Sequence, residues 1–318
     1  MFNGGQQEMH LLHVKDKLLL LAYSDVPEFL RMAVKVKIPG TFRRSPLFRF
    51  ADVHSYNYGT VQKRYGVEEL LNASLIEGDT EFIVMEYPTD PLLKATSTLI
   101  TNTNTRIVIS LIGKRYHFES DFLRENYELV KTFSGEEFEA ECEGARNDSK
   151  KRDRWISNGL NAVKDTLVYQ NHQELLKNEG SHFEVEIHKR KDIIGGREKM
   201  LLRINCNGWV DKKPPTLEFL KSLDLIYMRA TEYIYSSGVP LDPTLLHCLA
   251  GVGRTGMFVF FYIMRRKILS GEVKENMRLE AFIDLLLFLR SRRTWMVETL
   301  EQMKFLYDIF VVGTHSLQ

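Results

Sequence analysis

The spacing of hydrophobic positions changes several times along the chain, and each change predicts a different element. Residues 24–38, SDVPEFLRMAVKVKI, have apolar residues at helical spacing after a candidate cap at Ser24 or Asp25. From about residue 60 to 120 the pattern shifts to short β-rich runs, EFIVME and TRIVISLI, which polar turns separate. Strand-like runs resume with SHFEVEIHKR at 181–190 and KMLLRINCNGW at 199–209.

The last third of the chain has the strongest helical periodicity. In residues 216–237 apolar side chains recur on one face of a predicted helix, at Leu217, Leu220, Leu223, Ile226 and Met228. PTLLHCL then predicts a short buried strand, and RTGMFVFFYIMRRKILSG predicts a buried helix that Lys267 and Gly271 close. Two more helices are predicted at about 278–292 and 299–311.

Residues 135–155, GEEFEAECEGARNDSKKRDRW, form the most charged segment, with an acidic block before a basic one. This composition predicts a solvated loop or an edge hairpin, and a docking surface is the alternative. Elsewhere strands alternate with helices, and no composition break is long enough for a linker. We therefore predict one large α/β domain over residues 1–318, with a core at about 25–311 and a short N-terminal extension at 1–24.

Charge and cysteine content limit the classes of partner. The 318 residues carry a formal net charge of +1, so bulk electrostatics give no reason to expect nucleic acid or membrane. The apolar run LLLLAY at 18–23 is too short for a signal-peptide core or a membrane span. Three cysteines, Cys142, Cys206 and Cys248, are too few for a disulfide framework and fit a reducing compartment. We expect a cytoplasmic protein, and the sequence does not reveal its oligomeric state.

The stretch LLHCLAGVGRTGMF, residues 245–258, carries the candidate chemistry. Cys248 lies in the predicted strand, and Arg254 stands six positions later at the start of the predicted helix, with two glycines between them. Such a strand–loop–helix turn points backbone N–H groups inward at the positive end of a helix, where they bind an anion. A guanidinium donates to two oxygens of a phosphoryl group, and the same amides favour a thiolate at the base of the loop.

Two other interpretations of this stretch are weaker. A nucleotide-binding loop is also rich in glycine, but GVGRTG lacks the lysine of a Walker motif. A buried cysteine before a helix cap would explain neither the glycines nor Arg254. The pattern therefore favours a nucleophile, Cys248, which attacks phosphorus and carries a thiophosphate intermediate.

HCLAGVGRTG resembles the signature loop of the protein tyrosine phosphatases, in particular the tyrosine-specific, non-receptor branch. Four other segments are similar to that family: FRFADVHSYNYGTV to its phosphotyrosine-recognition loop, LLNASLIEG to its Asn-Ala-Ser strand, WVDKKPP to its mobile acid loop, and LRSRRTWMVETLEQMKFLYD to its arginine-rich helix and glutamine loop. The resemblance covers most of residues 25–311. The degree to which the sequence departs from the family pattern is also similar to that of virus-encoded members. It implies a cysteine phosphatase fold, with a central mixed, highly twisted β-sheet flanked by helices, and no metal or cofactor.

The resemblance also implies catalytic roles. Cys248 would be the nucleophile, Arg254 would bind the phosphate, and Asp211 would act as general acid and then as base for the attacking water. Thr255 would hydrogen-bond the Cys248 thiolate, although a threonine at a helix start is also an ordinary cap. Glu298 and Gln302 occupy the places of two glutamines of the family. Among the supporting residues, His247 would order the loop backbone and Arg290 would hold the phosphate loop.

Substrate binding is expected from two loops. The backbone amides that would hold the phosphate belong to Leu249, Ala250, Gly251, Val252 and Gly253. Phe50, on the recognition loop, would form an aromatic wall of a slot deep enough for a phenyl phosphate and too deep for phosphoserine. Asp52 would hold the backbone of a phosphotyrosine-containing protein or peptide.

Several positions depart from the family pattern. Phe50 stands where tyrosine is usual, Val210 where the mobile loop has proline, and Leu249 where serine is common. Glu298 replaces the water-orienting glutamine, and a negative charge near a phosphoryl group costs about 1 kcal/mol at 4 Å even in water. The segment EYPTDPLL, in the region 86–101, also lacks the Gln-Gly-Pro and the aromatic pair that are usual in the family.

Two functions from different classes follow. The first is an active protein-tyrosine phosphatase. The second is a pseudophosphatase that keeps the phosphotyrosine cradle and has lost turnover. Cys248, Arg254 and Asp211 together favour the enzyme, because a pure binder has no use for the acid. A dual-specificity or lipid phosphatase is disfavoured by the length of the domain and by the recognition loop.

Overall fold

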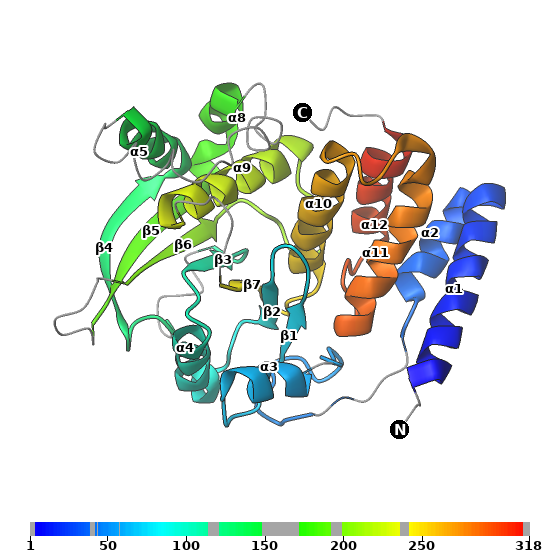
Figure 1. The fold of residues 1–318 in the computed structure, drawn as a ribbon, viewed down its shortest axis with the longest axis horizontal. Helices are drawn as coiled ribbons and strands as arrows, with labels where there is room; N and C mark the ends of the chain where they lie inside the picture. Colours follow the sequence, from blue (N-terminus) through cyan, green and yellow to red (C-terminus); the bar gives the residue numbers. More distant parts are fainter. Residues whose placement is uncertain are drawn as a thin grey trace.

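Seven strands pair into one mixed sheet in the order β1-β2-β7-β3-β6-β5-β4 (Figure 1). The structure is a computed structural model that describes residues 4–38, 42, 44–56, 58–113, 121–147, 172–191, 199–235 and 242–313. The strands are β1 (Ala73–Ile76), β2 (Phe82–Glu86), β3 (Ile107–Ser110), β4 (Tyr127–Ser134), β5 (Phe183–Arg190), β6 (Met200–Cys206) and β7 (Thr244–Cys248). The predicted mixed α/β fold is confirmed, as are the strands predicted within 81–86, 105–112, 181–190, 199–209 and 243–249.

The four central strands β2, β7, β3 and β6 run parallel, while β1, β5 and β4 are antiparallel to their neighbours. All five residues of β7 are buried, as expected for a strand with neighbours on both sides and helices on its faces. Because parallel strands end at the same edge, the residues that follow β2, β7, β3 and β6 come together there. Ligands bind at this kind of edge in open α/β sheets.

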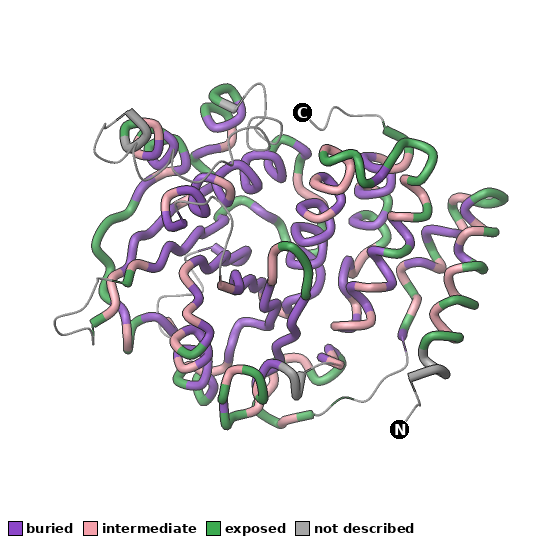
Figure 2. The backbone as a smooth tube through the Cα atoms, viewed as in Figure 1, coloured by how far each residue is buried: buried purple, intermediate pink, exposed green. Residues whose placement is uncertain are grey.

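Helices cover the sheet, and a further group of helices packs beside it (Figure 1). Helix α9 lies across β5 and β6 with α5 and α8 beside it, and α10, α11, α12, α2 and α1 form a neighbouring group. Figure 2 shows buried backbone through the central strands and along α10, and exposed backbone on the outer side of α1. The helices are α1 (Gly4–Ser24), α2 (Val26–Lys35), α3 (Tyr58–Tyr65), α4 (Leu93–Asn102), α5 (Gly135–Asn147), α8 (His172–Glu179), α9 (Leu217–Ile234), α10 (Gly253–Leu269), α11 (Arg278–Arg292) and α12 (Leu300–Tyr307). Short helical turns occupy Asp90–Leu92, Gly180–His182, Glu275–Met277 and Asp308–Val312.

The predicted cap at Asp25 is confirmed, and the helix predicted at 216–237 begins with a cap that was not predicted. Asp25 accepts a hydrogen bond from the Glu28 N–H at 3.0 Å and begins α2. Thr216 accepts one from the Phe219 N–H at 3.1 Å and begins α9. Each cap satisfies one of the backbone donors that a helix N-terminus leaves unpaired.

The charged segment was predicted wrongly, since its described part is helix α5 and neither a loop nor a hairpin. Glu136 and Glu137 lie in the first turn, where negative charge interacts favourably with the helix dipole. Phe138 and Cys142, four residues apart, are fully buried on one face. That i, i+4 pair was the signal of a helix, and the density of charge obscured it. Residues 148–155 lie outside the described part.

The region 60–120 is also less β-rich than predicted, because α3 lies near its start and α4 separates β2 from β3. In α4 the buried positions Ala95, Thr96, Leu99 and Ile100 follow helical spacing. The strands on either side of α4 were recognised in the sequence. The helical periodicity between them is weaker than the strand pattern and was missed.

Residues 4–24, which were predicted as a short extension, form helix α1. Leu18 and Ala22 are buried, and Lys15 Nζ lies 2.8 Å from carboxylate oxygens of both Glu280 and Asp284 on α11. The helix therefore packs on the core through α2 and α11. None of the helices in the described ranges is both long enough and apolar enough to cross a membrane.

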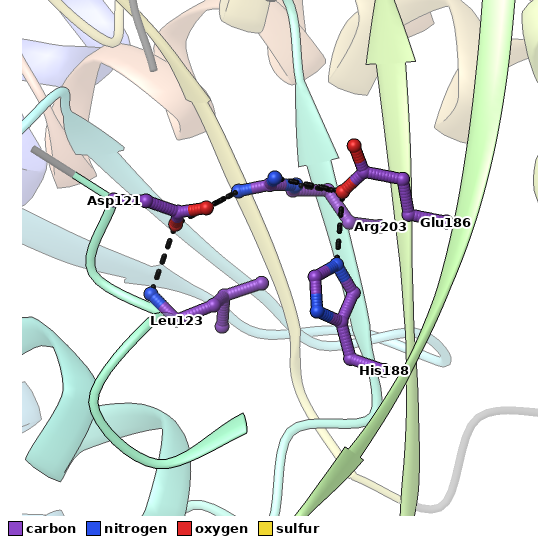
Figure 3. Close-up of polar contacts among 5 residues, drawn as sticks. All are labelled: Asp121, Leu123, Glu186, His188 and Arg203. Atoms are coloured by element: carbon purple, nitrogen blue, oxygen red, sulfur yellow. Dashed lines mark hydrogen bonds and ion pairs between the residues drawn. The ribbon is translucent and has the colours of Figure 1, made fainter. Parts of the chain in front are cut away.

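A buried polar cluster joins β5 and β6 at a distance along the sheet from β7 (Figure 3). Glu186 Oε2 lies 2.7 Å from Arg203 Nε and 2.9 Å from His188 Nε2, and Asp121 binds the other side of the Arg203 guanidinium at 2.8 Å. Burial alone would raise the pKa of Glu186, but the hydrogen bond with His188 and the charge of Arg203 lower it to about 2. The Glu186 carboxylate therefore stays charged at pH values well below the ordinary pKa of a glutamate.

We expect the Glu186→Gln variant to lose on the order of 3 kcal/mol of unfolding free energy at neutral pH, because Arg203 loses a buried charged partner. A carboxyl with a depressed folded pKa stabilises the fold above its unfolded pKa, near 4.5, and this contribution is lost as pH falls toward about 2. Denaturant unfolding from pH 7 to 2.5 should show the difference from wild type shrinking with acidity. Glu128→Gln, at an exposed position of β4, is the control, and a difference independent of pH would contradict the expectation.

Candidate active site

The nucleophile candidate ends the central strand. Cys248 is the last residue of β7 and is only 3% exposed. The phosphate loop, residues 248–254, connects it to α10, and the Gly251 N–H donates to Cys248 Sγ at 3.2 Å. Gly251 has φ = +70°, and a Cβ there would lie 2.2 Å from the Met85 carbonyl oxygen. Only glycine fits this position without displacing β2.

The carbonyl groups of residues 249–252 in the phosphate loop all accept hydrogen bonds from the surrounding protein. The Leu249 oxygen accepts from the Tyr87 N–H at 3.0 Å and the Val252 oxygen from the Val297 N–H at 3.2 Å. Arg293 donates to the Ala250 and Gly251 oxygens at 2.8 and 2.9 Å. In a trans peptide the next N–H points opposite to the carbonyl, so the amides of residues 250–253 face away from these partners. Of these amides, that of Gly251 donates directly to Cys248 Sγ, as in an anion cradle.

The support of the loop comes from Arg293, so the prediction that Arg290 holds it is wrong. Arg290 is buried and donates to the carbonyl oxygens of Ala33, Val34, Val36, Met296 and Val297. It thereby ties the end of α2 to the chain after α11. The fully buried Arg293 lies behind the loop, where burial lowers its pKa to about 10 and Glu86 and Cys248 oppose that shift. The sequence Arg-Ser-Arg-Arg at 290–293 does not reveal which of its three arginines faces inward.

Arg254 reaches from the start of α10 across the carboxyl ends of the neighbouring strands. Its Nη1 donates to the carbonyl oxygens of Leu111, after β3, and Trp209, after β6, at 2.9 and 3.3 Å. Its Nη2 donates to Asp211 Oδ1 at 2.8 Å. Its Nε is buried and has no partner in the part of the chain that the structure describes. The guanidinium is thus oriented by two carbonyls, and its Nε is left for an oxygen of a ligand.

Asp211 lies on the acid loop, residues 209–215, at the rim of the cradle. Its side chain is 58% exposed although it pairs with Arg254. Trp209 Nε1 closes the loop by donating to the Lys213 oxygen at 3.0 Å, and Thr299 Oγ1 donates to the Lys212 oxygen at 3.1 Å. The structure therefore brings Asp211, the predicted acid, into contact with Arg254, which was predicted to bind the phosphate. The acid loop also contacts Thr299 at the start of α12.

A pocket of about 510 Å³ opens between these elements. It is lined by residues of three strand ends, among them Ile112, Trp209, Asp211, Leu249 and Arg254. Among the described residues no group of three His, Cys, Asp or Glu side chains could hold a metal ion. The pocket lining contains the Arg254 guanidinium and the Asp211 carboxylate, and Cys248 adjoins it along the chain through Leu249.

Thr255 and His247, on either side of the phosphate loop, are both buried. Thr255 Oγ1 is buried and finds no hydrogen-bond partner among the described residues, so it does not bond Cys248 in this structure. It is not the cap of α10 either, because that helix begins at Gly253 with Val252 in the capping position. His247 is fully buried between the rings of Tyr87 and Phe122, beside the loop it was predicted to order.

Glu298 and Gln302 both lie against the phosphate loop. A Cβ on Gly253 would be 3.0 Å from Glu298 Oε2 and 3.2 Å from Gln302 Nε2. Gln302 forms a capping box with Thr299, and its Oε1 also accepts from the Glu298 N–H at 3.0 Å. Burial raises the pKa of the Glu298 carboxyl above its ordinary value; Asp211 and Asp52 add to the rise, and Lys212 and Arg254 oppose it.

The recognition loop is attached to the phosphate loop through two residues that the sequence analysis missed. Glu86, opposite Cys248 in the sheet, accepts hydrogen bonds from the Arg49 and Phe50 amides at 2.9 and 3.2 Å. Asn72 donates to Glu86 at 3.1 Å and accepts from Arg293 at 2.7 Å. Burial raises the pKa of Glu86, and these donors oppose the rise. A buried acid in a strand was the available signal.

Phe50 is half-buried and Asp52 is exposed. The main-chain bonds of Phe50 place its loop beside β2, and the charge of Asp52 reaches Glu298. The structure therefore gathers the residues predicted on the recognition, phosphate, acid and glutamine loops around one edge of the sheet.

Comparison with known proteins agrees with this geometry. The family model described as protein-tyrosine phosphatase matches residues 141–312. The chain is 26% identical over 128 residues to human tyrosine-protein phosphatase non-receptor type 14, a match that spans 39% of this chain and 10% of that protein. It is 25% identical over 268 residues to tyrosine-protein phosphatase 2 of Schizosaccharomyces pombe, spanning 82% of this chain and 33% of that one. The chain thus spans a tenth to a third of the length of these relatives.

The fold is shared with solved catalytic domains. The catalytic domain of human protein tyrosine phosphatase non-receptor type 18 superposes with a TM-score of 0.55 at 16% identity, over 94% of this chain and 97% of that domain. The match of the family model covers more than half of the chain and includes the acid, phosphate and glutamine loops. The chain belongs to the protein-tyrosine phosphatase family.

Proposed function

We propose that the protein hydrolyses phosphotyrosine in proteins or peptides through a cysteinyl-phosphate intermediate. One observation carries this proposal: Cys248 Sγ lies at the base of the phosphate loop and accepts from the Gly251 N–H, and Arg254 at the end of that loop contacts Asp211. A binding module needs the cradle and the guanidinium, but it has no use for a carboxylate at the rim. The related PTPN18 was solved in complex with HER2 phosphopeptides, which supports phosphotyrosine as the ligand class.

In the first step the Cys248 thiolate attacks phosphorus, and the bond from phosphorus to the phenolic oxygen breaks. The amides of residues 250–253 and Arg254 stabilise the equatorial oxygens, where charge accumulates. Asp211 gives its proton to the leaving phenolate. The Asp211–Arg254 contact at 2.8 Å has to give way, because Arg254 then binds phosphate oxygens and Asp211 faces the leaving group.

In the second step water attacks phosphorus from the side that the phenol has left. Asp211 takes one proton from the water, and the phosphorus–sulfur bond breaks with its electron pair returning to Cys248. Inorganic phosphate and the thiolate are the products. Since the reaction requires a free thiol, a reducing compartment such as the cytoplasm suits the enzyme.

A pseudophosphatase is the second candidate, and Glu298 is the observation that favours it. Its carboxyl lies against the phosphate loop, where a negative charge opposes a bound phosphoryl dianion. The loss of the family's glutamine at this place would harm the water step most directly.

Release of phosphate from a phosphotyrosine peptide tests the function and separates the two candidates. We expect catalytic turnover of the tyrosine peptide and far slower turnover of the matching phosphoserine peptide, because the shorter side chain does not reach Cys248. Tight binding of the peptide without phosphate release would instead assign the pseudophosphatase.

A further inference from the structure

We propose that Glu298 acts as a neutral carboxylic acid in the second step, in which water attacks the cysteinyl phosphate. The protonation state of Glu298 then controls the rate at which the free enzyme is regenerated. This inference rests on the proposed function. It concerns only the second half-reaction, in which water replaces the phenol.

The first support is the place of the carboxyl group. Glu298 Oε2 approaches the start of α10 at the point where Gly253 lacks a side chain, 3.0 Å from an added Cβ. Gly253 lies in the phosphate loop, so a phosphoryl group in the cradle and the water attacking it are near this carboxyl. Gly253 therefore gives the Glu298 side chain access to the reacting centre.

The second support is the donor beside it. Gln302 Oε1 accepts two backbone N–H bonds, from Glu298 and Thr299, which determines the orientation of its amide. Gln302 Nε2 then points toward Gly253 as well, at 3.2 Å from the added Cβ. Gln302 is fully buried, and within the described ranges its Nε2 has no hydrogen-bond partner. A buried N–H donor without a partner costs free energy, and a water or phosphate oxygen would satisfy it.

A neutral carboxyl provides one O–H donor and one carbonyl acceptor, the same pair of functions that a glutamine amide offers. A carboxylate only accepts, and it repels the phosphoryl group that it faces. Water in this step gives its proton to Asp211, phosphorus gains an oxygen, and the bond to Cys248 breaks. Glu298 keeps its proton throughout and only positions the water.

The charges around Glu298 come from three elements. Lys212 Nζ, on the acid loop, lies 3.9 Å from Oε1, and Arg254 of α10 is the second cation. Asp211 of the acid loop and Asp52 of the recognition loop oppose them. Burial, together with the two carboxylates, raises the pKa of Glu298 despite both cations. A bound phosphoryl dianion adds further negative charge, so the neutral form gains when the intermediate is present.

The test is the pH dependence of the two half-reactions with 4-nitrophenyl phosphate, a substrate whose leaving group departs easily. Stopped-flow measurement gives the burst for the first step, and where a burst is present the steady state gives the slower water step. In wild type, kcat should fall as pH rises and Glu298 loses its proton. Glu298→Gln should remove that fall: its kcat should match wild type within about twofold at pH 5 and exceed it about tenfold at pH 8.

Two further variants keep the result interpretable. Glu280→Gln removes the same charge at an exposed position of α11 and should follow the wild-type profile. Glu298→Ala should have a lower kcat than Glu298→Gln at every pH, because it can neither donate to nor accept from the water. Parallel profiles of wild type and Glu298→Gln, or equal kcat values of the Ala and Gln variants, would overturn the inference. Absence of 4-nitrophenol release by wild type at every pH would instead reject the proposed function itself.

Discussion

Replacing Cys248 by serine should abolish turnover of a phosphotyrosine peptide while leaving its binding intact. A hydroxyl at the base of the phosphate loop is not ionised near neutral pH, so the attacking group is lost, and we expect a decrease of roughly 10⁴-fold or more. The carbonyl bonds that orient the loop come from Tyr87, Arg293 and Val297 and do not involve the sulfur. The amides therefore still face the ligand. Phosphate release and peptide titration by calorimetry measure the two quantities.

Cys142→Ser is the matched control, because it makes the same change of one atom in a buried cysteine on α5. Cys142 contributes to the core and not to the pocket, so this variant should keep its kcat even if it unfolds at a lower temperature. Phosphate release by Cys248→Ser at a rate close to that of wild type would show that the reaction uses another nucleophile.

Replacing Asp211 by alanine should slow turnover of phosphotyrosine by about 10²–10⁴-fold, the usual contribution of a positioned general acid. The same change should tighten binding of the peptide, because Arg254 Nη2 loses the carboxylate that it contacts at 2.8 Å. Phosphate oxygens then meet an arginine without an internal competitor. The loss in kcat should become smaller for aryl phosphates whose phenols are more acidic, since their phenolates leave without a proton.

Asp211→Asn separates the charge of this side chain from its size. The amide cannot donate a proton to the phenolate, so its kcat should fall as far as that of the alanine variant. Its dissociation constant should lie between those of wild type and alanine. Equal kcat values for the Asn variant and wild type would exclude Asp211 as the acid and move the search to another residue of the pocket.

The sequence was most informative where chemistry and local structure share one continuous segment. Cys248 and Arg254 are six residues apart, so the strand, the glycine turn and the helix start were all readable in a single motif. The distant acid was readable only by resemblance, through Trp209 and Asp211. The structure adds that Asp211 contacts Arg254, a pairing between segments 43 residues apart that no local pattern contains.

Errors arose where the inward direction of a side chain depends on tertiary packing. Arg290 and Arg293 are both buried on or just after the same helix, yet only Arg293 reaches the phosphate loop. Glu86 was not singled out because an acidic residue at a strand end is ordinarily exposed. Its role follows from its place opposite Cys248, which only the pairing of β2 with β7 reveals.

The connection from Phe50 through Glu86 and Asn72 to Arg293 has a consequence for how a protein with this site can diversify. The recognition loop, which is proposed to select the substrate, and the phosphate loop, which is proposed to react with it, are joined by one chain of hydrogen bonds. A mutation that broadened the substrate slot by moving the recognition loop should also loosen the phosphate loop, so we expect selectivity and rate to change together. New specificities should therefore evolve more readily on side chains that extend outward from the recognition loop than on the backbone that carries them.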